Sequence, residues 1–176
     1  MKKFYLNILN KEQGRVFSNL DFLTKKGFYL AGGTGLALQL GHRTSVDFDK
    51  SDASFFYYEY PLVKKLVKIK GVAVASVEDI AAMKMIAISH RPVKRDYVDV
   101  FFLLKFFSLE EIFSFVKKRY PNFNQYFSLR ALSYFDDIEE KRGRKVMILK
   151  KSFSWEKAKK EIFAKARKYQ LEMLKK

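Results

Sequence analysis

Apolar residues recur at helical spacing near the start of the chain and then give way to short, strand-like runs. From Asn10 to Lys26 they stand three to four positions apart, and a Lys-Lys-Gly sequence closes the stretch, which predicts one helix. The apolar run Phe28 to Ala31 is typical of a short buried strand. Gly32-Gly33 interrupts it, and we expect Thr34 to cap a helix that continues to about Leu40.

Alternating polarity marks the strands expected in the next part of the chain. In Ser45 to Asp49, Val and Phe alternate with Asp47 and Asp49, so the two carboxylates lie on one face of a predicted strand. Ser54 to Tyr60 is expected to form a second strand, and Gly71 to Ala75 a further short one.

The remainder of the chain is predicted to be mostly helical. Helices are expected from Ser76, which caps the first, to Ile88, from Asp96 to Phe106, and from Ser128 to Glu140. Ser108-x-x-Glu111 has the spacing of a capping box. A last helix is predicted from a stripe of apolar residues three to four positions apart: Trp155, Ala158, Ile162, Ala166, Tyr169 and Met173.

Together these elements predict an α+β fold with a small mixed sheet and flanking helices. We expect residues 1–106 to form the core and residues 107–176 a helical C-terminal extension. The length of 176 residues, with 48% hydrophobic and 31% charged residues, fits such a globular protein. No apolar run is long enough to span a bilayer and no signal sequence opens the chain, so we expect a cytoplasmic protein that does not contact a membrane.

The charge and the missing cysteines narrow the expected chemistry. The formal net charge is +16, which favours a polyanionic partner such as nucleic acid. Without cysteine the chain has no thiolate nucleophile, and its two histidines leave little scope for a His-based metal site. Any bound metal is therefore expected to be a hard cation held by carboxylates.

Asp47 and Asp49 are the strongest candidates for that metal site. Carboxylates two residues apart on a strand are separated by about 6.5 to 7 Å between Cα atoms, so both can reach one divalent ion. Gly32-Gly33-Thr34, just ahead of a predicted helix, suits a phosphate group because backbone N–H groups and the helix dipole can approach it closely. Each pattern alone is more often a solvated strand face or a plain turn.

In combination, these motifs resemble the AbiEii/AbiGii-type toxin family of nucleotidyltransferases, which belong to bacterial toxin–antitoxin and phage-defence systems. The resemblance covers Tyr29-Leu-Ala-Gly-Gly-Thr34, Leu36-Ala-Leu-Gln-Leu-Gly-His-Arg43 and Ser45-Val-Asp-Phe-Asp49. It continues through Ala75-Ser-Val-Glu-Asp-Ile-Ala-Ala-Met-Lys84 and Arg95-Asp-Tyr-Val-Asp99.

The resemblance implies a nucleotidyltransferase fold and transfer of a nucleoside monophosphate from an NTP to an RNA acceptor, with tRNA the expected acceptor. It also implies Mg²⁺ and a cognate antitoxin as a partner. The residues expected to carry catalysis are Asp47, Asp49, Lys84 and Asp96, of which Asp47 and Asp49 bind the metal. The residues expected to bind nucleotide are Gly32, Gly33, Thr34, Arg43 and Lys84.

Several of these residues have a second interpretation. Lys84 either contacts the nucleotide or forms an Asp–Lys pair, since burying it alone is unfavourable. Asp96 either belongs to the site or favours a helix N-terminus, and Asp99 either joins it or pairs with Arg95. Basic residues are expected to contact RNA or to form a solvated face: Arg91, Lys94, Arg95, Arg142 and Arg144.

One departure from the family pattern favours an alternative function. Family members place a helix and a strand after the Asp-x-Asp strand, whereas here Lys50-Ser51-Asp52 alone leads to Ser54. The chain is then a reduced enzyme, a chain from which a segment is absent, or an inactive remnant. The alternative function is that of such a catalytically impaired remnant, which acts as a basic RNA-binding or antitoxin-binding protein.

Overall fold

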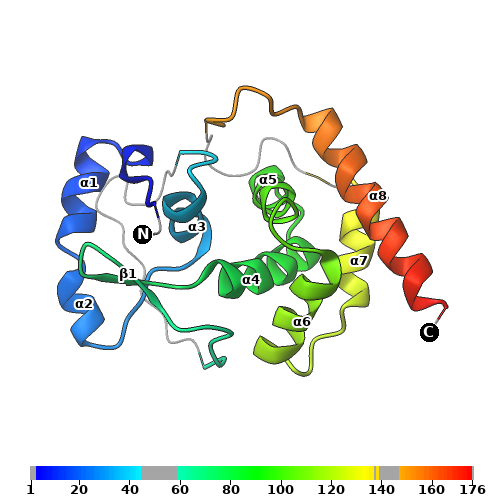
Figure 1. Cartoon of the computed structure of the whole chain (residues 1–176), viewed down its shortest axis with the longest axis horizontal. Helices are drawn as coiled ribbons and strands as arrows, with labels where there is room; N and C mark the ends of the chain where they lie inside the picture. The colour runs from blue at the N-terminus through cyan, green and yellow to red at the C-terminus, as the bar shows by residue number, and fades with distance from the viewer. Residues whose placement is uncertain (1–2, 45–58, 137, 139–146, 176) are drawn as a thin grey trace. The chain divides into compact units, whose positions relative to one another are not determined.

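The computed structural model describes residues 3–44, 59–136, 138 and 147–175, which Figure 1 traces in colour. The chain divides into two compact units. The first comprises Met1–Ile80 with Arg144–Lys150, and the second comprises Ala81–Gly143 with Lys151–Lys176. The predicted domain limits, 1–106 and 107–176, stay a prediction.

The first unit begins with a short 3₁₀ helix, η1 (Leu6–Ile8), and two helices, α1 (Lys11–Ser18) and α2 (Asp21–Lys25). The prediction of one helix from Asn10 to Lys26 is therefore wrong. The helix stops because the Asn19 side chain donates a 2.9 Å hydrogen bond to the carbonyl of Arg15, and the chain turns before α2 begins.

Helix α3 (Gly32–Leu40) starts three residues earlier than expected. Ala31 is its N-cap and Gly32 has a φ of +68°, a left-handed conformation that favours glycine. The backbone has therefore entered the helix before it reaches Thr34, and the prediction that Thr34 is the cap is wrong. Gly32-Gly33, expected to lie between the strand and the helix, in fact belongs to the first turn of the helix.

A two-stranded antiparallel hairpin follows the undescribed segment. It consists of β1 (Val67–Ile69) and β2 (Val72–Val74), with Ile69 opposite Val72. Lys70 and Gly71 join the strands and both have positive φ, at 48° and 85°, as a tight two-residue hairpin turn requires. The strand expected from Gly71 to Ala75 is confirmed, whereas β1 has no alternating pattern long enough to predict it.

Short backbone bridges extend this hairpin. Leu30 pairs in parallel with Val74, and its N–H donates to the Ala73 carbonyl over 2.8 Å. Arg43 pairs antiparallel with Ile148, so residues near 148 return to the first unit. The expected α+β class is confirmed, because the described residues combine helices with a small antiparallel sheet. The strand expected at residues 45–49, and residues 54–58 of the next one, lie outside the described residues.

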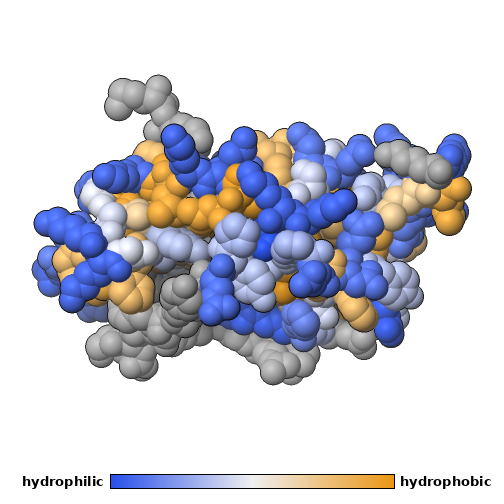
Figure 2. Space-filling model, turned by 90° about the horizontal axis from the view of Figure 1, so that it is seen from below, coloured by the Kyte–Doolittle hydropathy of each residue, from blue (hydrophilic) through white to orange (hydrophobic). Residues whose placement is uncertain are grey.

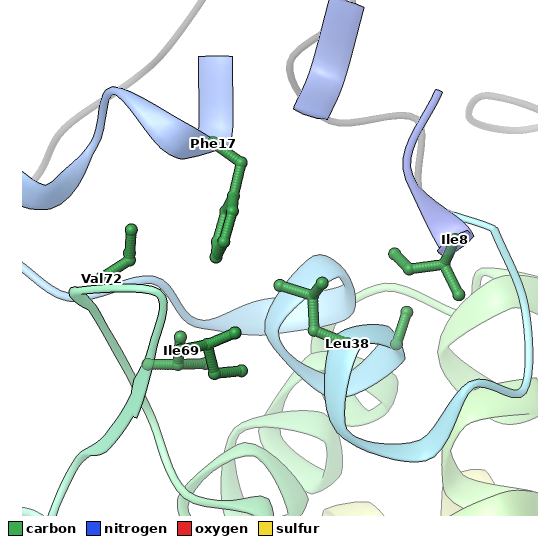
Figure 3. Packing of buried hydrophobic residues seen from close by; sticks show 7 residues of the cluster. Ile8, Phe17, Leu38, Ile69 and Val72 are labelled. Atoms are coloured by element: carbon green, nitrogen blue, oxygen red, sulfur yellow. The ribbon is translucent and has the colours of Figure 1, made fainter. Parts of the chain in front are cut away.

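The hydrophobic core of the first unit forms around α3 and the hairpin. Figure 3 shows Ile8, Phe17, Leu38, Ile69 and Val72 directed toward one another from η1, α1, α3 and the two strands. Ala37 and Val74 complete the buried cluster. This packing fixes α3, and with it the glycine turn, against the hairpin.

The described part of the second unit is helical, from most of α4 (Val77–His90) through α5 (Lys94–Leu103), α6 (Leu109–Arg119), α7 (Tyr126–Ser133) and α8 (Trp155–Met173). Helix α8 packs against α5, α6 and α7. Within the described residues, no helix combines the length and the apolar character that a bilayer crossing requires.

The predicted helices are present, but some of them begin or end at other residues than expected. Helix α5 starts at Lys94 rather than Asp96, and α7 ends at Ser133 rather than Glu140 because Tyr134 is extended. Ala158, Ile162 and Ala166 are completely buried on α8, as their spacing predicts. Met173, the last residue of the predicted stripe, is instead 42% exposed.

The capping box predicted at the start of α6 is present. The N–H of Glu111 donates to Ser108 Oγ over 3.1 Å, and the N–H of Ser108 donates to Glu111 Oε2 over 2.7 Å. The backbone hydrogen bond from Ser108, together with its side chain, holds the pKa of Glu111 below the usual value of 4.5.

Because that pKa is lowered in the folded state, Glu111 stabilises the fold above its unfolded pKa. We expect this contribution to be complete at neutral pH and to disappear as the pH falls below 4.5 through the lowered value. Thermal unfolding of the wild type and of Glu111→Ala from pH 7 to pH 3 will test this. The difference between their midpoints should shrink only in the acid range, and a constant difference would contradict the assignment.

Candidate functional site

A buried ion-pair cluster joins α4 and α5 in the second unit. Lys84 Nζ donates to Asp96 Oδ1 over 2.5 Å and lies 2.6 Å from Asp99 Oδ2. The three side chains are 7%, 1% and 0% exposed. Asp96 and Asp99 are three residues apart, so the first turns of α5 present both carboxylates on one face. The Asp–Lys pair considered in the sequence is therefore present, with both carboxylates as partners.

Arg91 extends this cluster toward solvent. Its Nε lies 3.4 Å from Asp96 Oδ2, and its side chain is 53% exposed. Two cations and two carboxylates thus balance the charge of the group, which offsets the cost of burying Asp96 and Asp99.

One carboxylate oxygen of the cluster accepts no hydrogen bond within the described residues. Asp96 Oδ2 is buried and, among the described residues, accepts no hydrogen bond, because the approach of Arg91 does not form one. Buried polar atoms are normally satisfied, and exceptions call for an explanation such as catalysis or a bound ion. This oxygen can accept a proton or hydrogen bond, and as a hard donor it also suits a divalent cation.

In the first unit the structure brings together two of the residues predicted to bind nucleotide. The guanidinium of Arg43 lies directly over Gly33, so that a Cβ on Gly33 would stand 2.2 Å from Arg43 Nη2. Arg43 is 3% exposed, and its Nη1 donates to the Thr44 carbonyl over 2.9 Å. Thr34 is completely buried. A side chain at position 33 would displace the guanidinium, so the position of Arg43 favours glycine there.

Asp79 is a structural carboxylate that the sequence does not single out. It accepts hydrogen bonds from the N–H groups of Val63 and Lys64 over 2.8 and 3.1 Å, and from Ser76 Oγ over 2.6 Å. It is completely buried. Ser76 caps α4 as predicted, but the partners at 63 and 64 are set by tertiary structure, so no sequence signal indicates them.

The remaining predicted site residues fall into two groups. Lys94 and Arg95 lie in the first turn of α5, next to Asp96. Asp47, Asp49, Arg142 and Arg144 lie outside the described residues, so the metal site and part of the RNA contact stay predictions. Within the described ranges, no group of three or more His, Cys, Asp or Glu side chains could hold a metal ion.

Comparison with known families assigns the class of this helix-rich α+β protein. The sequence model of the family described as "Nucleotidyl transferase AbiEii toxin, Type IV TA system" matches residues 58–170. The chain therefore belongs to the AbiEii family of nucleotidyl transferase toxins. The matched range contains Arg91, Lys84 and Asp96, and it begins after Asp49. Membership suggests transferase activity and implies an antitoxin partner, as expected from the sequence.

A protein of Aquifex aeolicus (strain VF5), described as uncharacterized, is 32% identical over 176 aligned positions. The alignment includes 75% of this chain and 85% of the relative. Because three quarters of a 176-residue chain cannot fill 176 positions, the relative contains residues with no counterpart here. This agrees with the short connection noted after Asp49, although the alignment does not locate the difference. No solved structure matches the chain.

Proposed function

We propose that this protein transfers a nucleoside monophosphate from an NTP to an RNA acceptor, with tRNA as the acceptor, and that the transfer arrests growth until a cognate antitoxin counteracts it. The observation that carries the proposal is the buried Lys84–Asp96–Asp99 cluster with its open carboxylate oxygen, inside the range matched by the AbiEii family. The protein would act in the cytoplasm, in toxin–antitoxin or phage-defence systems.

In this reaction, the acceptor hydroxyl oxygen forms a bond to the α-phosphorus while the bond from that phosphorus to the oxygen bridging to the β-phosphate breaks. Pyrophosphate leaves, and the hydroxyl proton passes to a base. Asp96 Oδ2 is suited to that role because, within the described residues, it accepts no hydrogen bond, although Arg91 Nε lies 3.4 Å from it. Lys84 holds Asp96 in place through a 2.5 Å hydrogen bond to Asp96 Oδ1.

The phosphate and metal contacts are proposed for the first unit. Gly32, Gly33, Thr34 and Arg43 would hold the triphosphate, supported by the position of the Arg43 guanidinium over Gly33. Asp47 and Asp49 would hold Mg²⁺, which when bound offsets charge on the phosphates. Hard carboxylate oxygens fit that ion, and nucleotidyltransferases generally use a divalent metal with an NTP.

The test of this function is label transfer from each of the four α-labelled NTPs to total tRNA in the presence of Mg²⁺. Wild-type protein should label tRNA from one NTP or a subset of them, and Asp47→Ala should reduce labelling by about 10²-fold or more because the ion loses a ligand. Glu12→Ala, which removes an exposed carboxylate from α1, is the matched control and should label normally. Equal labelling by Asp47→Ala and wild type would contradict the metal assignment.

A second candidate function is a remnant of the fold that binds RNA or an antitoxin without catalysis. The Aquifex relative contains residues with no counterpart in this chain, which favours a reduced form of the fold. It predicts RNA binding that depends on salt but not on Mg²⁺ or NTP. Absence of label from all four NTPs, with RNA still retained, would select this candidate.

A further inference from the structure

We propose that Lys94, Trp155 and Lys159, here called the Trp155 edge, bind the RNA acceptor, with the two lysines contacting its phosphate backbone and the indole stacking on a base. The inference deepens the proposed function and rests on it, since it names where the acceptor is held rather than where it reacts. Trp155 belongs to the apolar stripe that predicts the last helix. The structure gives it two cationic neighbours at a partly exposed position.

The geometry of the edge is defined by one indole ring. Lys94 Nζ lies 5.2 Å and Lys159 Nζ lies 5.8 Å from the centre of the Trp155 ring. Lys94 belongs to α5, whereas Lys159 follows Trp155 by four residues in α8, so tertiary packing of α5 on α8 brings the two cations to the same ring. Each ammonium gains from the ring's electron-rich face, which favours holding both here despite their mutual repulsion.

The indole ring packs against the buried ring of Tyr97. Tyr97 meets it edge to face, with ring centres 6.4 Å apart and planes at 76°. Tyr97 is 1% exposed, and its hydroxyl donates to the Ala131 carbonyl over 3.1 Å. A ring held in this way loses little entropy when a nucleic-acid base stacks on it, as aromatic platforms do in proteins that bind single-stranded RNA.

The charge around the edge is strongly positive. The segments 91–95 and 155–160 contain six Lys or Arg residues, of which Arg91 pairs with Asp96 and Lys159 pairs with Glu156 over 2.8 Å. The remaining positive charge attracts anions, and a phosphodiester backbone supplies one per nucleotide. Lys94 is two residues from Asp96 in the sequence, and Arg91 Nε lies 3.4 Å from Asp96 Oδ2, so basic residues also stand next to the reaction site.

A protein partner would favour a different surface of the second unit. Exposed apolar residues lie near the middle of α8, at Phe163, and at its C-terminal end, at Leu171, Met173 and the C-cap Leu174. Orange atoms at the right-hand end of Figure 2 mark the C-terminal end of this helix. Interfaces between proteins bury apolar anchors, whereas the Trp155 edge is dominated by cations, so RNA is the partner that fits it.

The test compares binding of total tRNA to three full-length proteins over a series of salt concentrations. The Lys94→Gln/Lys159→Gln variant should bind about tenfold or more weakly at about 0.1 M salt, and its log–log salt slope should fall by about 1.5 because two phosphate contacts are lost. Lys117→Gln/Lys118→Gln removes the same charge from exposed positions on α6 and should keep the wild-type slope. Equal losses in the two variants would overturn the proposal.

A second variant tests the aromatic ring. Trp155→Leu keeps the lysines and an apolar side chain, so we expect RNA affinity to fall about tenfold with an unchanged salt slope, since stacking rather than charge is lost. Unchanged affinity in a variant whose thermal midpoint is near wild type would overturn the role of the indole. Polyglutamate is added as a competitor. If it displaces tRNA at an equal concentration of charges, the proposal that the partner is RNA is overturned in favour of an acidic protein.

NTP binding and label transfer separate this proposal from the function on which it rests. If wild type transfers label while the lysine variant keeps both NTP binding and full RNA affinity, the edge is wrong and the function stands. If wild type transfers no label but RNA affinity depends on the edge as described, the proposed reaction fails and the edge remains as an RNA site.

Discussion

Lys84→Met is expected to destabilise the fold by about 3 to 5 kcal/mol. The substitution keeps most of the side-chain volume but removes the cation between Asp96 and Asp99, which are 1% and 0% exposed. Two carboxylates then stand close together in a buried place, and breaking a buried pair in this way usually costs that much. Urea unfolding followed by circular dichroism measures the change.

Two further variants define the cause of that loss. Lys157→Met makes the same replacement at an exposed position of α8 and should change the free energy of unfolding by less than about 0.5 kcal/mol. Adding Asp99→Asn to Lys84→Met should recover part of the stability, because one unpaired charge is removed. A loss below about 1 kcal/mol in Lys84→Met would show that water reaches the cluster and that the pair behaves as a surface ion pair.

Asp96→Asn is expected to lower label transfer by about 10²- to 10⁴-fold with little change in the folded structure. Asparagine preserves the shape of the side chain and can still accept a hydrogen bond from Lys84, but it removes the negative oxygen that faces Arg91. That loss is typical when a positioned proton acceptor is removed. Single-turnover label transfer over a range of pH would report it.

Asp99→Asn is the matched control, because it makes the same chemical change one helical turn away. Asp99 Oδ2 is engaged by Lys84, whereas Asp96 Oδ2 accepts no hydrogen bond in the described structure, so Asp99→Asn should lower transfer much less. Equal losses of label transfer in the two variants would mean that both carboxylates act only by holding Lys84.

Local sequence patterns predicted the helical elements because each depends on neighbouring residues. The capping box at Ser108 and the buried face of α8 follow from spacing alone, and the structure confirms both. The limits failed where a single backbone angle or side-chain hydrogen bond decides them, as at Gly32 and Asn19. Neither feature can be predicted from the spacing of apolar residues.

The candidate site was predicted in part for the same reason. Lys84, Asp96 and Asp99 were singled out from their positions on helices and from the family resemblance, and the structure joins them in one cluster. The residues Asp47 and Asp49 lie outside the described structure and stay predictions. Asp79 could not be predicted as a structural carboxylate, because its partners at Val63 and Lys64 lie far from it in sequence.

The sequence by itself determined the family, the positive charge, the helical second half and the identity of the ionisable residues, since these depend on composition and short-range spacing. Only the tertiary structure decided which charges meet. It placed Lys84 of α4 between two carboxylates of α5, left one Asp96 oxygen open, laid Arg43 over Gly33 and brought Lys94 to the ring of Trp155. Those contacts arise from tertiary packing, which brings together residues whose spacing along the chain does not predict that they meet.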